Sequence, residues 1–427
     1  MSSHNRPAAN RSANRSGSRA EAKRRRKKPS HWWSRGTGIR LRIWMAVNAV
    51  LLSALSYGVY MAVVSNAQGN SYSGLGGGSK SNPGLLDRLK GKSDPNVPTK
   101  QQFMKPDGIY FGAATVKAPY DAKELDGFTT DDGGIRPTMA SYFLDWEHEF
   151  NPYSMTAAYE HGTLPVLTWE PWAGGVQNPA GGVILDTNTD QPKFRLGNII
   201  SGRFDAYITR TATAIADAKW PLVLRLAHEM NGGWYPWSEA VNANKPGEYV
   251  QAWRHVHDLF DKAGATNVIW TWSPNIIRPK PKVKLQPYYP GDDYVDWIGM
   301  TGYGVREKTP EITFGATIKQ VRAFADKPLI IMETGAQIDK QQLNWVRAFF
   351  PWLQAHPDIV GFIWMQKDRD TGARANWRFT SSKAEQQAFQ AGLATLRLAT
   401  GQTKTSSGPS PGAPAASPSD SPAGSTP

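Results

Sequence analysis

Eight short apolar runs recur between residues 108 and 365, and amphipathic stretches separate most of them. Each run has the length and the β-branched or aromatic content of a buried strand. The runs are 108–116, 137–146, 163–169, 222–228, 267–272, 295–303, 328–333 and 359–365. The clearest helical stretches are 203–219, 246–262, 314–325 and 341–355. Eight strands alternating with helices over about 300 residues predict an α/β fold, a (β/α)8 TIM barrel.

A doubly wound open sheet is the alternative fold for the same alternation. Such sheets bind nucleotides at a Gly-rich turn between a strand and a helix, and none of the predicted strands is followed by one. The barrel is therefore the preferred prediction. The gap between the third and fourth strands, residues 171–203, is longer than the others and predicts a rim insertion that shapes a cleft.

The segment before the barrel has the composition of a membrane signal-anchor. Residues 1–42 carry 13 Lys or Arg against one acidic residue and are expected to be disordered. Residues 43–64 contain no charge and are long enough to cross a bilayer as a helix. The basic cluster predicts a cytoplasmic N-terminus, a single-pass membrane protein and an extracellular barrel. The alternative is a signal peptide cleaved near Ala67, which would release a secreted protein.

The remaining segments are expected to be a linker and a tail around one folded domain. Residues 65–102 are rich in Gly, Ser and Pro, and residues 401–427 are rich in Pro, Ser and Ala, so neither can bury a core. The barrel domain is then 103–400. After residue 42 the chain has 36 basic and 35 acidic residues, so no nucleic-acid partner is expected. The chain has no cysteine, which excludes thiolate chemistry.

Two glutamates end matching strands of the predicted barrel. Glu229 follows the fourth strand, between His228 and Asn231, and Glu333 ends the seventh. Because the carboxyl ends of barrel strands surround one mouth, the two carboxylates should meet there. Hydrolysis of a glycoside needs such a pair, one acid and one carboxylate. A single glutamate would more simply form a salt bridge at a helix start, so the matching positions indicate catalysis.

Strand parity adds a cation beneath the glutamates. Arg225, Ala227 and Glu229 share one parity, so Arg225 should point into the barrel. A buried guanidinium needs an anionic partner, and both Glu333 and Glu170 are candidates. A purely structural ion pair explains Arg225 equally well.

Aromatic side chains surround both carboxylates in the predicted site. Tyr303 lies near the end of the sixth strand and can donate a hydrogen bond to Glu333. Glu229 must be protonated at rest, which a less polar environment built by Trp234 and Trp237 would favour. We expect these two tryptophans to form walls of the cleft.

Four motifs in order make the chain resemble the glycoside hydrolases of family 26, a group of mannanases and related β-glucanases among the retaining barrel glycosidases. The motifs are RLAHEMNG at 225–232, WYPW at 234–237, YPGDDYVDWIG at 289–299 and KPLIIMETG at 327–335, and the resemblance covers residues 107–378. It implies that Glu229 is the general acid/base and Glu333 the nucleophile, with carboxyl groups roughly 5–5.5 Å apart. It also places His228 at the glycone subsite.

Further residues are candidates for substrate contacts. Trp169, Glu170 and Trp172 at the end of the third strand, and Trp364 on the eighth, are expected to stack on sugars or bind their hydroxyls. Family mannanases tend to carry an acidic residue where Thr301 stands, so the resemblance does not by itself imply mannan as the substrate. Mannan, mixed-linkage β-glucan, β-xylan and a self-made exopolysaccharide are all candidate substrates. Asn231 is expected to support the site.

No metal or cofactor is expected, because the HEMNG motif at 228–232 lacks the second histidine of a zinc protease. Together these observations predict a membrane-anchored, monomeric, retaining endo-β-glycosidase acting on a polysaccharide. A transglycosylase that remodels an exported polysaccharide would use the same residues. A carbohydrate-binding barrel without turnover is the third hypothesis.

Overall fold

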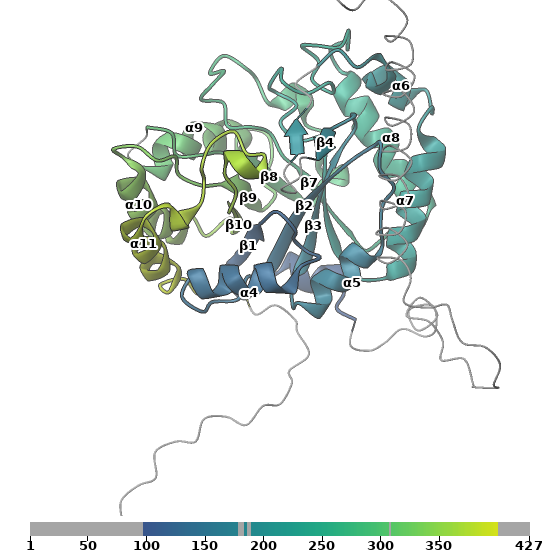
Figure 1. Ribbon diagram of the computed structural model, residues 1–427. Helices are drawn as coiled ribbons and strands as arrows, with labels where there is room; N and C mark the ends of the chain where they lie inside the picture. Colours follow the sequence, from purple (N-terminus) through teal and green to yellow (C-terminus); the bar gives the residue numbers. More distant parts are fainter. Residues whose placement is uncertain (1–96, 178–182, 186–188, 307–308, 400–427) are drawn as a thin grey trace, which may run out of the picture. The chain divides into compact units, whose positions relative to one another are not determined.

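A closed barrel of eight parallel strands forms the centre of the described chain (Figure 1). The computed structural model describes residues 97–177, 183–185, 189–306 and 309–399. The barrel order is β1-β10-β9-β8-β7-β6-β3-β2, which confirms the predicted fold class. The strands are β1 (Tyr110–Ala114), β2 (Met139–Asp145), β3 (Leu164–Glu170), β6 (Leu222–Leu226), β7 (Val268–Trp272), β8 (Trp297–Thr301), β9 (Leu329–Thr334) and β10 (Ile359–Met365). Each overlaps one predicted strand.

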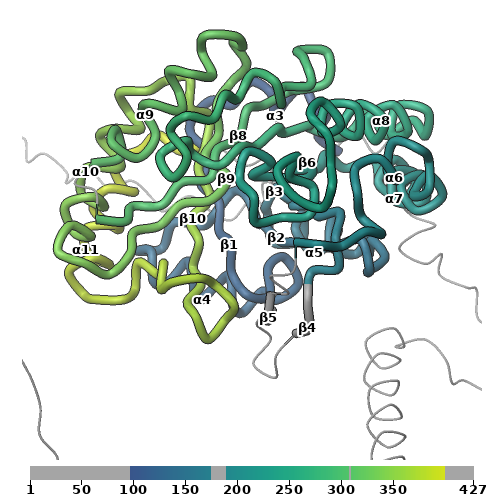
Figure 2. The backbone as a smooth tube through the Cα atoms, turned by 90° about the horizontal axis from the view of Figure 1, so that it is seen from above, coloured from purple at the N-terminus to yellow at the C-terminus, as the bar shows by residue number. Residues whose placement is uncertain are grey.

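Helices surround the barrel, as the view from above shows (Figure 2). They are α4 (Ala122–Asp131), α5 (Tyr153–Glu160), α7 (Asp205–Ala218), α8 (Glu248–Lys262), α9 (Pro310–Val321), α10 (Gln342–Gln354) and α11 (Lys383–Leu393). Several begin at a residue that satisfies free backbone N–H groups: the Asp121 side chain accepts from two amides of α4, and that of Ser382 from one of α11. In α8 the buried residues Tyr249, Trp253, Val256 and Phe260 recur at helical spacing, so one face packs on the barrel.

Two apolar layers follow from the alternation of side chains along the strands. Val166 and Val223 belong to a cluster inside the barrel, while the next residues, Leu167 and Leu224, belong to the layer between strands and helices. The short helix α3 (Lys100–Met104) begins three residues before the predicted start of the domain and adds Phe103 to the inner cluster. Burying each such side chain contributes roughly 1.5–3 kcal/mol.

The predicted insertion after β3 contains structure of its own. It holds an antiparallel pair, β4 (Gly175–Gln177) and β5 (Val183–Leu185), followed by the 3-10 turn η1 (Pro192–Phe194) and the helix α6 (Leu196–Ile200). The predicted membrane segment at 43–64, the basic segment before it and the tail after 400 lie outside the described residues. Within the described ranges, no helix is both long and apolar enough to cross a bilayer.

Candidate active site

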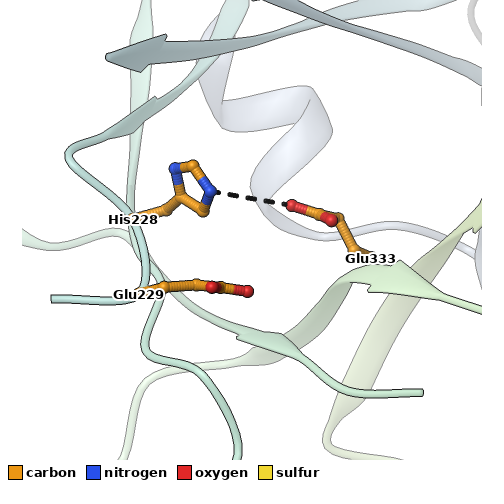
Figure 3. Close-up of side chains that lie close together, drawn as sticks. All are labelled: His228, Glu229 and Glu333. Carbon is orange, nitrogen blue, oxygen red and sulfur yellow. Dashed lines mark ion pairs between the residues drawn. The ribbon is translucent and has the colours of Figure 1, made fainter. Parts of the chain in front are cut away.

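Glu229 and Glu333 meet at the carboxyl ends of β6 and β9, together with the ring of His228 (Figure 3). One donor or acceptor atom from each of the three lies within 4.8 Å of the other two. His228 Nε2 faces Glu333 Oε1 at 3.9 Å. All three residues are buried: the exposed fraction is 1% for His228, 7% for Glu229 and 8% for Glu333. The pairing predicted from matching strand ends is therefore present.

The backbone after β6 explains why two successive residues, His228 and Glu229, both reach the site. Ala227 and Glu229 have φ values of 44° and 54°, a region that non-glycine residues rarely adopt. The expectation that Ala227 shares the face of Arg225 and Glu229 was wrong: it packs in the outer layer, where its carbonyl accepts from Tyr249 Oη at 3.1 Å. The irregular backbone thus ends the strand alternation at Ala227, directly before His228 and Glu229.

Arg225 lies fully buried inside the barrel and pairs with Glu333, which decides between its two candidate partners. Its Nη1 donates to Glu333 Oε1, its Nη2 to Thr301 Oγ1, and its Nε to Ser273 Oγ at 2.9 Å. Tyr303 Oη donates to the other oxygen of Glu333 at 2.7 Å, as the sequence predicted. Both oxygens of Glu333 are therefore held, which fixes the orientation of the carboxylate.

Glu229 has a different environment from Glu333. Its Oε2 accepts from Trp234 Nε1 at 2.5 Å and its Oε1 from Asn275 Nδ2 at 2.8 Å. Burial, and next the charge of Glu333, raise the pKa of Glu229 above its ordinary value, while the charge of Arg225 and these two hydrogen bonds act in the opposite direction. Glu229 is thus suited to act as an acid, whereas the carboxyl group of Glu333 is held in place as a hydrogen-bond acceptor.

Asn275 is a site residue that the sequence did not single out. Its backbone and the Asn231 side chain form a reciprocal pair, with both hydrogen bonds at 2.9 Å, so Asn231 positions the group that contacts Glu229. The supporting role expected of Asn231 therefore has a definite geometry. The signal available in the sequence was a polar side chain three residues after the fifth strand, at the same barrel mouth as the glutamates.

A large open cleft of about 1510 Å³ contains both glutamates. Of the predicted residues, Glu170, Trp234 and Tyr303 also line it, and Tyr235, Lys367 and Trp377 join them without having been predicted. Trp377 stacks on Tyr303 with ring centroids 4.1 Å apart. Pockets for drug-sized ligands measure roughly 300–1000 Å³, so this cleft suits a longer molecule.

Two predicted sugar platforms lie elsewhere. Trp169 and Trp364 are fully buried between the barrel and its helices, where Trp169 packs against Phe260 and Trp364 against Phe389. Neither ring offers a face to the cleft, so this part of the prediction was wrong. The reason is strand alternation: Glu170, one residue after Trp169, points to the mouth, and its neighbour must point away.

Trp172 and Trp237 are also buried, and they support the cleft without forming its surface. Trp237 stacks on Tyr235 with centroids 4.4 Å apart, and its Nε1 donates to the carbonyl of His228 at 2.7 Å. Trp172 meets Tyr235 edge to face at 5.3 Å. The wall expected of Trp237 is therefore provided by Tyr235, which the tryptophans hold in place.

His228 and Glu170 present hydrogen-bonding groups without net charge. Burial, and next the nearby Arg225, lower the pKa of His228 well below its usual value, so the ring is neutral. Burial raises the pKa of Glu170 to about 8, so this carboxyl is mostly protonated at neutral pH. Within the described part of the chain, Nδ1 of His228 has no hydrogen-bond partner. Glu170 lines the cleft, where a protonated carboxyl suits the hydroxyls of a neutral ligand, whereas His228 is buried and does not line it.

His228, Glu229 and Glu333 also form the one group of potential metal ligands brought together among the described residues. Glu333 is also paired with the buried guanidinium of Arg225, which would repel a cation. The donor set therefore fits proton transfer better than metal binding.

Comparisons with known proteins agree with this geometry. Residues 159–383 match the family model of glycosyl hydrolase family 26. Over 266 residues the chain is 29% identical to Endoglucanase H of Acetivibrio thermocellus, covering 58% of the chain and 26% of that protein. Over 167 residues it is 33% identical to mannan endo-1,4-beta-mannosidase A and B of Caldalkalibacillus mannanilyticus, covering 36% and 30%. The matches thus span less than a third of either relative.

A solved structure shows the same fold. The catalytic domain of the endo-beta-1,4-mannanase from Bacillus sp. JAMB-750 superposes with a TM-score of 0.51 at 20% identity, covering 70% of this chain and 91% of that one.

Replacing Arg225 with Met should destabilise the protein strongly. Loss of the guanidinium leaves Glu333 buried without its cation, and breaking one partner of a buried pair typically costs about 3–5 kcal/mol of unfolding free energy. Arg136→Met is the matched control, because Arg136 pairs with Asp126 at the surface and should contribute less than about 1 kcal/mol. Denaturant unfolding at pH 7 measures both, and equal small losses would contradict the importance of the Arg225 pair.

Proposed function

Because the chain belongs to glycosyl hydrolase family 26, we propose that it is a retaining, endo-acting β-glycosidase. The substrate is a β-linked polysaccharide of the β-mannan or β-glucan class. Glu229 is the general acid/base, and Glu333 is the nucleophile. The observation that carries this proposal is the close approach of the two carboxyl groups, an acid and an oriented carboxylate, in one open cleft.

The separation of the carboxyl groups supports retention of configuration. An inverting glycosidase needs about 6.5–9.5 Å between them to admit a water molecule, whereas a retaining enzyme needs about 5–5.5 Å. One oxygen of Glu229 and one of Glu333 lie within 4.8 Å of each other, which supports the shorter of these two separations. This geometry leaves room for direct attack of Glu333 on the anomeric carbon.

In the first step Glu333 attacks the anomeric carbon while Glu229 protonates the departing glycosidic oxygen. Arg225 and Tyr303 hold the attacking carboxylate in place. In the second step Glu229 removes a proton from water, which attacks the glycosyl-enzyme and frees Glu333. The change of role has a physical basis: the charge of Glu333 helps to raise the pKa of Glu229, and that charge disappears once Glu333 is esterified.

Three features support a neutral polysaccharide as the substrate. The cleft is open, and Trp234, Tyr235 and Trp377 line it with apolar faces on which sugar rings can stack. Glu170, which lines the cleft, supplies a hydrogen-bonding group that is mostly uncharged at neutral pH. The names of the two sequence relatives, an endoglucanase and a mannan endo-1,4-beta-mannosidase, indicate the glucan and mannan classes.

Membrane attachment is part of the proposal and rests on the sequence. The uncharged run at 43–64, preceded by 13 basic residues, supports a single-pass anchor with a cytoplasmic N-terminus and an extracellular enzyme. We expect activity in the membrane fraction of cells that express the full chain, with release by detergent. Activity found mainly in the medium would favour cleavage near Ala67.

Replacing either catalytic glutamate should give a distinct defect. Glu333→Ala removes the nucleophile and should lower kcat on β-mannan or β-glucan by about four orders of magnitude or more. Glu229→Ala should lower it by about 10²–10⁴, and less on aryl glycosides whose leaving group needs no protonation. Reducing-sugar assays of a polysaccharide panel measure these rates, with Glu147→Ala, an exposed glutamate paired to Lys193, as the control.

Retained turnover in Glu333→Ala would overturn the assignment of the nucleophile. If the wild-type protein forms products longer than the substrate, the same two residues catalyse transglycosylation.

Replacing Trp234 with Phe should move the basic limb of the pH profile of kcat/KM to higher pH. Glu229 must be protonated to act, so activity falls as pH rises through its pKa. The indole N–H stabilises the carboxylate form, and its loss raises that pKa further. Trp220→Phe, a Trp that stacks on Tyr159, should leave the profile unchanged. A downward shift, or none, in Trp234→Phe would show that Glu229 does not set this limb.

A further inference from the structure

Two tyrosine rings are exposed at the wall that β1 and β2 contribute to the cleft. Tyr120 follows β1 and Tyr153 begins α5, and 45% and 49% of their surfaces are accessible. The rings stack on each other with centroids 6.3 Å apart. Tyr120 lines the cleft, and Tyr153 backs its ring without lining the cleft itself. The other large apolar side chains exposed in the described ranges are Ile312 and Ile338, and neither of them lines the cleft.

The position of the Tyr120 ring is fixed by its neighbours. Tyr142 lies against it edge to face at 6.2 Å, and the hydroxyl of Tyr142 shares a hydrogen bond of 2.7 Å with Ser154, beside Tyr153. The backbone N–H of Tyr120 donates to the carbonyl of Lys117 at 2.8 Å. A ring that is already ordered loses little freedom when a ligand stacks on it.

The same cleft contains Tyr120 and the two catalytic glutamates. Consecutive residues of β2 also line this cleft: Tyr142 contacts Tyr120, and Phe143 lies 6.2 Å from the ring of His228. Tyr142 packs in the outer apolar layer and Phe143 against the inner one, so the end of one strand connects the exposed pair to the site. Single exposed tyrosines are common on protein surfaces and carry no meaning. An exposed ring that lines the cleft of the catalytic glutamates and stacks on a second ring is a different arrangement.

We propose that Tyr120, supported by Tyr153, forms a remote carbohydrate subsite. It stacks on the apolar face of a neutral β-linked pyranose in the substrate chain, several sugars away from the bond that is cleaved. This subsite deepens the proposed function and rests on it. Binding so far from the reaction acts equally on substrate and transition state, so it lowers KM for long chains without raising kcat.

Steady-state kinetics of the full chain on two substrates test the subsite. One substrate is the β-glucan or β-mannan that the wild-type protein hydrolyses, and the other is an aryl glycoside of the matching disaccharide, which is too short to occupy the catalytic site and a remote subsite together. In Tyr120→Ala the ratio of the polymer KM to the disaccharide KM should rise about five- to tenfold, because a stacking contact is lost. Tyr120→Phe keeps the ring and should restore the ratio, and Ile312→Ala is the exposed control.

Affinity electrophoresis in gels that contain β-glucan or β-mannan gives a reading that needs no turnover. Glu333→Ala should be retarded by the polymer, and adding Tyr120→Ala should reduce that retardation. An unchanged KM ratio together with equal retardation would overturn the subsite while the proposed function stands. A wild-type protein that hydrolyses neither polymer refutes the proposed function, and the subsite falls with it if neither polymer retards the protein.

Discussion

The buried guanidinium of Arg225 is the interaction on which the site depends. From the inside of β6 it reaches Ser273 just after β7, Thr301 on β8 and Glu333 on β9, and so it fixes one side of the barrel around a single charge. A charge in that position is tolerated only with an ionised partner and further hydrogen bonds. The requirement holds Glu333 at the mouth, and Glu333 in turn raises the pKa of the acid opposite it. The same pair therefore bears on the stability of the barrel and on the catalysis we propose.

The period of the apolar residues was enough to predict the barrel, because each strand alternates between two apolar layers and each helix repeats every three to four residues. It was also enough to bring Glu229 and Glu333 to one mouth. Parity placed Arg225 inside the barrel but left its partner open between Glu170 and Glu333, since a choice among neighbouring strands needs the register. The pairing of Thr301 with Glu333 across β8 and β9 contains a register shift that no local pattern shows.

The wrong predictions about the site share one cause. A tryptophan near a strand end is a good stacking surface only if it points to the mouth, and composition does not reveal direction. Trp169 points outward because Glu170 points in, and Trp364 fills the outer layer. The left-handed backbone at Ala227 and the reciprocal amide pair of Asn231 and Asn275 depend on contacts between separate loops. These contacts have no signature within a single segment.

The anomeric form of the first product tests whether Glu229 and Glu333 act by double displacement, as we propose. Proton NMR during hydrolysis of a β-linked oligosaccharide resolves the α- and β-anomers before they interconvert. We expect the β-anomer to appear first, because two displacements at the same carbon restore the original configuration. Initial formation of the α-anomer would show a single displacement by water and would contradict the role given to Glu333.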